Sequence, residues 1–78
     1  MRYKSSHTYI IDFDNHGISL RPLFDELELF QAGWPTVEAT VGMGVINITH
    51  RDRRSAECSA DMLLSRLRSF PWFKEKVV

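Results

Sequence analysis

The sequence has 78 residues, 44% of them hydrophobic and 12% aromatic, which allows one small folded domain and excludes an intrinsically disordered chain. The net charge is zero, but six acids and one base lie between Asp12 and Glu38, whereas seven bases and four acids lie between Arg51 and Lys76. A neutral domain with a pI near 6.8 is a poor nonspecific nucleic-acid binder. The separation of charge therefore indicates binding to a specific partner, because such polarity affects association more than folding.

The N-terminal segment and the cysteine content both favour a cytoplasmic protein. Residues 1–7 are polar and lack the apolar stretch of a signal peptide. No apolar run approaches the ~20 residues that span a membrane. Cys58 is the only cysteine, so no intrachain disulfide can form and nothing indicates an oxidising compartment.

Residues 8–13 are predicted to form the first strand. The segment is rich in β-branched and aromatic residues, and Tyr9, Ile11 and Phe13 share one face. The next four residues, Asp-Asn-His-Gly, have the composition of a turn.

A helix is predicted to come after this turn. Ser19 is the candidate N-cap, and Pro22 is acceptable in a first turn, where its missing N–H has no helical partner. Gly33 is suited to the position after the helix, and Pro35 prevents continuation. One apolar stripe at spacings of three and four consists of Leu20, Leu23, Phe24, Leu27 and Phe30.

Two further strands are predicted at residues 36–41 and 45–49. Both segments are rich in β-branched residues and alternate in polarity. The intervening Gly-Met-Gly predicts a hairpin loop of about three residues. One long bent strand, with the glycines in a bulge, is the alternative interpretation.

A second helix is predicted after the polar and mostly basic loop of residues 50–54. Ser55 is its candidate N-cap and Pro71 ends it. Its apolar stripe consists of Ala56, Ala60, Leu63, Leu64, Leu67 and Phe70. Cys58 and Met62 fall outside this stripe, so we expect them to be partly exposed or to lie under a partner.

The predicted fold class is α+β, with residues 1–78 forming a single domain. Residues 72–78 alternate weakly and are interpreted either as a fourth strand or as a tail held by its aromatic residues. The predicted order is β-α-β-β-α, with or without a final strand, in a small two-layer sandwich. With the final strand, the order is that of a ferredoxin-like fold. Both helices are expected on one face of an antiparallel sheet.

Two groups of residues carry side chains that could support chemistry. Asp12, Asp14 and His16 have groups that bind metals, but the sequence lacks the further ligands and the distal glutamate of an EF-hand. We interpret this segment as an ordinary turn. Cys58 and His50 both lie near the start of the second helix, where a thiolate is favoured. No third residue that would orient this pair is identifiable, so we predict no catalytic residue, no cofactor and no metal.

Arginines dominate the predicted binding surface. Arg51, Arg53 and Arg54 precede a helix N-terminus, and guanidinium groups together with unpaired backbone N–H groups can bind anions. Arg66 and Arg68 add positive charge on the outer side of the same helix. Either a carboxylate cluster on a protein or the phosphates of a nucleic acid would suit such a surface.

The remaining predicted partner-binding residues are acidic or apolar. Asp25 and Glu28 lie on the acidic flank of the first helix, and Leu29 on the same flank has no obvious core position. Trp34 and Trp72 flank prolines at the ends of elements. Large aromatic residues close to charged groups are typical of the centre of a protein interface.

These features predict a small non-enzymatic protein that binds a protein partner as an inhibitor, adaptor or regulatory subunit, such as an accessory inhibitor of a phage or mobile element. Binding would use an acidic helix face and a basic arginine loop. A homodimer is a further expectation, because the acidic half of one copy complements the basic half of another. The alternatives are a nucleic-acid-binding regulator that uses the basic second half, and a small enzyme based on the cysteine and histidine or on the aspartates.

Overall fold

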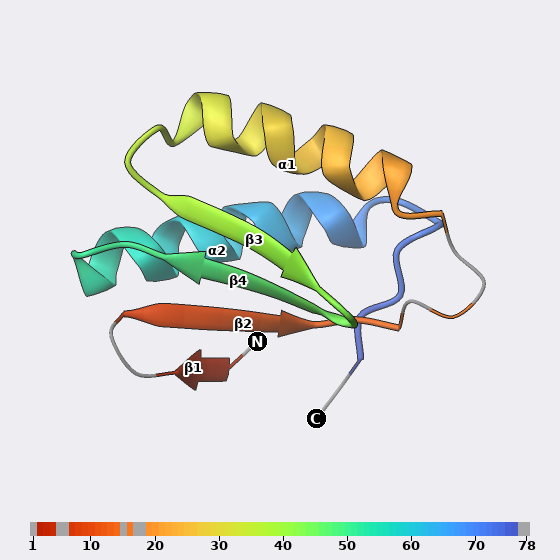
Figure 1. The fold of residues 1–78 in the computed structure, drawn as a ribbon, viewed down its shortest axis with the longest axis horizontal. Coiled ribbons are helices and arrows are strands. Elements are labelled where there is room, and N and C mark those ends of the chain that lie inside the picture. The colour runs from red at the N-terminus through yellow and green to blue at the C-terminus, as the bar shows by residue number, and fades with distance from the viewer. Residues whose placement is uncertain (1, 5–6, 15, 17–18, 77–78) are drawn as a thin grey trace.

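The structure, a computed structural model, describes residues 2–4, 7–14, 16 and 19–76. These residues form four strands and two helices (Figure 1). In chain order the elements are β1 (Arg2–Lys4), β2 (Thr8–Asp12), α1 (Arg21–Gly33), β3 (Glu38–Gly42), β4 (Val45–Thr49) and α2 (Arg53–Arg68). The predicted β-α-β-β-α order is confirmed from β2 onward.

The four strands form one antiparallel sheet in the order β1-β2-β4-β3. Ile48 in β4 lies opposite Tyr9 in β2 and opposite Ala39 in β3, so β4 is paired on both sides. β2 and β3 consequently run in the same direction with β4 between them, and α1 connects them in a split β-α-β arrangement. The β3–β4 connection is a hairpin, as predicted, with Gly44 at a φ of 74° that favours glycine.

Both helices pack on the same face of the sheet, which confirms the two-layer prediction. Alternate residues of β2 and β4 point to this face because side chains on a strand alternate sides. The buried cluster that joins the layers consists of Tyr9, Ile11, Phe13, Leu23, Leu27, Val37, Ile46, Ile48, Ala56, Ala60, Leu63, Leu64, Leu67 and Phe73. Phe24 of the predicted α1 stripe is not in this cluster and is 50% exposed. Burial of apolar side chains is the main source of stability in a domain of this size.

The edge of the sheet beside β2 differs from the ferredoxin-like expectation. β1 occupies most of that edge, with Lys4 opposite Thr8. The C-terminal segment adds one isolated bridge, between Phe13 and Glu75, instead of a fourth strand within residues 72–76. Residues 77–78 of the predicted strand lie outside the described residues. The edge position is taken by β1, a three-residue strand without a sequence pattern of its own.

The sequence predicted the start of α1 one residue too early and its end two residues too early. Leu20 is the N-cap, while Ser19, one residue earlier, accepts a hydrogen bond from the backbone N–H of Arg21 at 3.3 Å through its hydroxyl. Gly33 is the last helical residue, and Trp34 is the C-cap. Gly33 therefore does not take the left-handed conformation expected of a glycine after a helix.

Neither helix of the described residues is both long enough and apolar enough to cross a lipid bilayer.

Candidate partner-binding surfaces

The N-terminal end of α2 is capped by Asp52, three residues before the predicted cap Ser55. The Asp52 carboxylate accepts hydrogen bonds from the backbone N–H of Arg54 at 3.3 Å and from the Ser55 hydroxyl at 2.8 Å. The Ser55 hydroxyl and the Arg54 N–H lower the pKa of the Asp52 carboxyl. The predicted N-cap Ser55 is therefore wrong, and the Asp52 carboxylate already occupies the Arg54 N–H, one of the backbone donors that an external anion could use.

This cap also places the arginines differently from the prediction. Arg53 and Arg54 belong to the first turn of α2 and only Arg51 lies in the preceding loop. All three side chains are exposed. Within the described part of the chain, no ion pair involves Arg51 or Arg54. We call these three residues the arginine end of the molecule.

His50 braces the loop that leads to the arginine end. Its Nδ1 accepts a hydrogen bond from the backbone N–H of Asp52 at 2.8 Å, and its Nε2 lies 3.1 Å from the Thr36 hydroxyl oxygen. Both ring nitrogens are thus engaged with groups other than Cys58, which is exposed on α2. This arrangement gives His50 a structural role and leaves it poorly placed to act as a base for the thiol.

The two arginines near the C-terminal end of α2 are paired with carboxylates. Arg66 bonds to Glu26 of α1 through Nε and, at 3.4 Å, through Nη2. Arg68 bonds to Glu75 at 2.7 Å and 3.0 Å in a two-pronged contact. The hydrogen bond from Arg68 lowers the pKa of Glu75. These pairs tie α2 to α1 and to the C-terminal segment, so both arginines have a structural role besides the predicted binding role.

An apolar groove separates the exposed edges of α1 and α2. Its volume is about 380 Å³, and it is lined by Glu26, Leu29, Phe30, Gly33, Trp34, Met62, Leu63 and Arg66. Leu29 and Met62 are 63% and 57% exposed. We call this feature the α1–α2 groove. Three of the predicted binding residues, Leu29, Trp34 and Arg66, meet in it.

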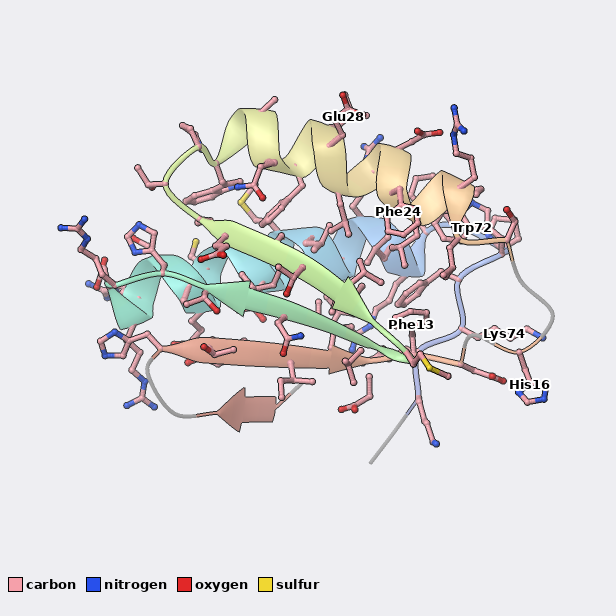
Figure 2. All side chains as sticks on the ribbon, viewed as in Figure 1. Phe13, His16, Phe24, Glu28, Trp72 and Lys74 are labelled. Carbon is pink, nitrogen blue, oxygen red and sulfur yellow. The ribbon has the colours of Figure 1, made fainter. Side chains whose placement is uncertain are left out.

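The acidic residues Asp25 and Glu28 are both exposed on α1. Glu28 projects away from the body of the molecule (Figure 2). Asp25 lies 3.6 Å from Arg21 one turn earlier, in a solvent-exposed pair. Exposed pairs of this kind contribute little to stability, so both carboxylates can reorganise around a partner.

The two tryptophans are half-buried and pack against the core. Trp72 stacks on Phe70 with a centroid distance of 5.1 Å and meets Phe73 edge-on at 6.2 Å. These aromatic side chains pack the C-terminal segment against one end of the core. Trp34 borders the α1–α2 groove, whereas Trp72 does not line it.

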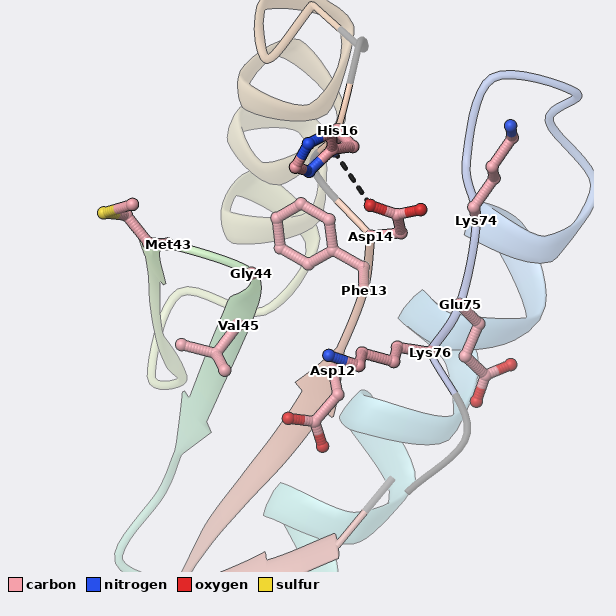
Figure 3. Close-up of a pocket in the computed structure, with 10 residues that line it drawn as sticks. All are labelled: Asp12, Phe13, Asp14, His16, Met43, Gly44, Val45, Lys74, Glu75 and Lys76. Carbon is pink, nitrogen blue, oxygen red and sulfur yellow. Dashed lines mark hydrogen bonds between the residues drawn. The ribbon is translucent and has the colours of Figure 1, made fainter.

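A second, polar pocket of about 820 Å³ lies at the end of the sheet where β2 and the C-terminal segment meet. Asp12, Asp14, His16, Lys74 and Lys76 surround it with charges of both signs (Figure 3). Asp14 accepts a hydrogen bond from the backbone N–H of His16 at 2.9 Å, as in an ordinary turn. Among the described residues, no group of three or more potential ligands could hold a metal ion.

Comparisons with protein-family models, with curated proteins and with solved structures gave no match. Function is therefore inferred from the surfaces of this chain alone.

Sequence reasoning missed most of the α1–α2 groove. Phe30 and Leu63 were placed in the apolar stripes, and Gly33 was interpreted as a helix terminator. The available signal was that Leu29 and Met62 are apolar residues outside those stripes. Two such residues, one on each helix, indicate a surface between the helices.

Proposed function

We propose that this chain is a small non-enzymatic protein that binds another protein and acts as an inhibitor, adaptor or regulatory subunit. The observation that carries this proposal is the difference between the arginines. Arg66 and Arg68 are engaged with carboxylates of the same chain, whereas Arg51 and Arg54 project from the arginine end without an ion pair among the described residues. Arginines held in this way are available to a partner.

Guanidinium groups are well suited to protein recognition. Arginine is enriched among the residues that contribute most to binding, because it forms two-pronged contacts with carboxylates and stacks on aromatic rings. Asp52 reduces the positive charge at this end but is already committed to capping α2. A partner surface with two or three carboxylates would complement the arginine end and would be attracted to it over a distance.

The acidic residues of α1 form a second surface that could bind a partner. Asp25 and Glu28 lie on α1, which lies beside α2 in the helical layer (Figure 1). An adaptor with two surfaces of opposite sign can contact two partners or two regions of one partner. The proposal includes self-association, because the acidic and basic surfaces of two copies complement each other.

Nucleic-acid binding is the weaker candidate. The arginine end supplies three guanidinium groups, and carboxylates of the same chain neutralise the charges of Arg66 and Arg68, two of the five that the basic second half was expected to provide. With three phosphate contacts, the logarithm of the binding constant would fall with the logarithm of the salt concentration with a slope of about −3. Absence of DNA and RNA binding at low salt would eliminate this candidate.

Affinity capture from cells of the native host tests the proposal. The tagged wild type is compared with the double variant Arg51→Glu/Arg54→Glu. The matched control is Lys74→Glu/Lys76→Glu, which reverses two exposed charges at the other end of the molecule. We expect the arginine variant to lose proteins that both the wild type and the control retain. Equal recovery by all three baits would contradict the proposal, provided that circular dichroism shows each bait folded.

A further inference from the structure

The two helices that border the α1–α2 groove carry complementary side chains at the same level along their length. The helices run antiparallel, so that the start of α1 lies beside the end of α2 (Figure 1). At the middle, Leu29 on one wall is matched by Met62 on the other. One turn before Leu29 lies Asp25, and one turn after Met62 lies Arg66. At this end of the groove, the lining residues Glu26 and Arg66 already form an ion pair, and Asp25 lies exposed on α1 next to Glu26.

Gly33 keeps the opposite end of the groove open. Its backbone is helical, so no left-handed conformation requires a glycine there. A Cβ placed on Gly33 would meet no atom within 4 Å, so packing inside the molecule does not require glycine either. Glycine nevertheless destabilises a helix relative to alanine. The missing side chain at Gly33 does not stabilise the fold. It does leave space for a molecule that enters the groove.

We propose that the α1–α2 groove is the docking surface for a second copy of this chain. The two copies face each other through their helical layers, related by a two-fold axis that runs along the groove. α1 of each copy then lies on α2 of the other, with Leu29 against the second copy's Met62. Such an interface uses the same patch twice, as a two-fold dimer must.

Charge complementarity selects this occupant and this axis. A two-fold axis along the groove keeps each position along the helices level with itself, so Asp25 lies level with the second copy's Arg66. The side chain of Arg66 is more than half exposed even though it is paired with Glu26, so it can bind a second carboxylate. An axis across the helices would instead place Asp25 over Gly33 and leave the charges unmatched.

The proposed dimer also places neighbouring helices antiparallel throughout. α1 is antiparallel to α2 within each copy, and the two-fold axis makes it antiparallel to the second copy's α2. This is the arrangement of an up-and-down four-helix bundle, in which apolar residues of facing helices form the core. Leu29 and Met62 would then move from solvent into that core, which contributes burial that a domain of 78 residues otherwise lacks.

The size of the surface predicts a moderate affinity. α1 and α2 side by side cover an area about 20 Å on each edge, from their lengths and the usual helix diameter. Counted over both copies this is about 800 Å², which is below the range of stable interfaces and is typical of weak, transient complexes. We expect the dissociation constant of the dimer to lie in the micromolar range, on the order of 10 µM, as is typical of small interfaces with few anchoring residues.

Dimerisation deepens the proposed function, and only its consequence for partner binding rests on that function. Because the axis runs along the groove, the arginine ends of both copies lie at the same end of the dimer. Two linked copies of one binding surface raise the effective affinity for a partner with two acidic regions.

Sedimentation velocity on the purified chain, from about 1 µM to about 500 µM, tests the dimer over a range that brackets the expected dissociation constant. The wild type should pass from monomer to dimer. Gly33→Leu should stay monomeric at concentrations at least about tenfold higher, since the new side chain fills the groove, and its melting temperature should equal or exceed that of the wild type. The matched control is Thr40→Leu, which adds an exposed leucine on the face of the sheet opposite the helices and should dimerise like the wild type.

A second pair of variants tests the dimer independently, in case Gly33→Leu does not fold. Met62→Glu should abolish the dimer, whereas Met43→Glu, at a hairpin position that is 92% exposed, should not. A wild type that remains monomeric throughout overturns the inference, as does a dimer that survives both Gly33→Leu and Met62→Glu. The wild type could prove monomeric while charge reversal at the arginine end still abolishes partner binding. That result would overturn the dimer and leave the proposed function intact.

Discussion

The two ends of α2 carry similar charges and use them differently. At the C-terminal end, Arg66 and Arg68 reach across to Glu26 and Glu75 and hold three segments of the chain together. At the N-terminal end, the Asp52 carboxylate caps the helix, and the arginines around it are exposed. A count of charges along the sequence does not distinguish these cases, because the partners of Arg66 and Arg68 depend on the fold.

The two ends of α2 should therefore differ in their tolerance of substitution. Changes at the C-terminal end should affect the stability of the fold, and changes at the arginine end should affect partner binding. Four substitutions test this difference, beginning with the largest expected effect.

Leu67→Ala should destabilise the protein by about 2–5 kcal/mol, because Leu67 is completely buried between the paired arginines and its truncation leaves a cavity. Chemical denaturation measures this effect. Ser65→Ala, at an exposed position on the same turn, should leave the denaturation midpoint nearly unchanged. Equal midpoints for Leu67→Ala and the wild type would show that α2 is not docked at this end.

Asp52→Ala should weaken the other end of α2 by removing its cap. We expect a lower melting temperature and faster hydrogen exchange in the first turn, with a smaller loss of stability than for Leu67→Ala. Asp52→Asn is the matched control, since asparagine caps helices about as well as aspartate. If Asp52→Ala and Asp52→Asn exchange at the same rate as the wild type, the cap contributes nothing to the arginine end.

Glu75→Gln should remove part of the pH dependence of stability. Arg68 lowers the pKa of Glu75 in the folded state, so this pair stabilises the fold above the carboxyl's unfolded pKa. The stabilisation is lost as the pH falls through the lower folded pKa. Because the Arg68 side chain is more than half exposed to solvent, we expect an effect below about 1 kcal/mol. Denaturation at neutral and acidic pH should show a smaller difference for Glu75→Gln than for the wild type, and an equal difference would contradict the assignment.

Arg54→Glu should have the smallest effect on folding, although it reverses a charge. An acid in the first turn of α2 interacts favourably with the helix dipole, so the melting temperature should stay the same or rise slightly. Arg66→Glu makes the same change at the other end and should lower the melting temperature, since it places two carboxylates side by side. A similar loss for both variants would remove the distinction between the two ends.

The fold was largely readable from the sequence because its elements have strong local patterns. Alternation identified β2, β3 and β4, and spacings of three and four identified both helices. β1 was missed because three residues carry no periodicity. The N-cap of α2 was misplaced because two capping residues, Asp52 and Ser55, compete within one turn, and only the backbone conformation decides between them.

The candidate surfaces were less predictable than the fold. Exposure of Arg51 and Arg54 was expected from their position beside a helix start, but the Arg66–Glu26 pair joins residues 40 positions apart. The groove depends on how two helices lie beside each other, which no local pattern specifies. Leu29 and Met62 signalled it only as apolar residues without a place in the core.

Hydrogen exchange of the protein bound to its captured partner is the most direct test of partner binding through the arginine end. We predict slower exchange upon binding at residues 50–56, around the arginine end of α2, and little change at residues 66–76. Protection confined to residues 66–76, with none at the arginine end, would contradict this central claim.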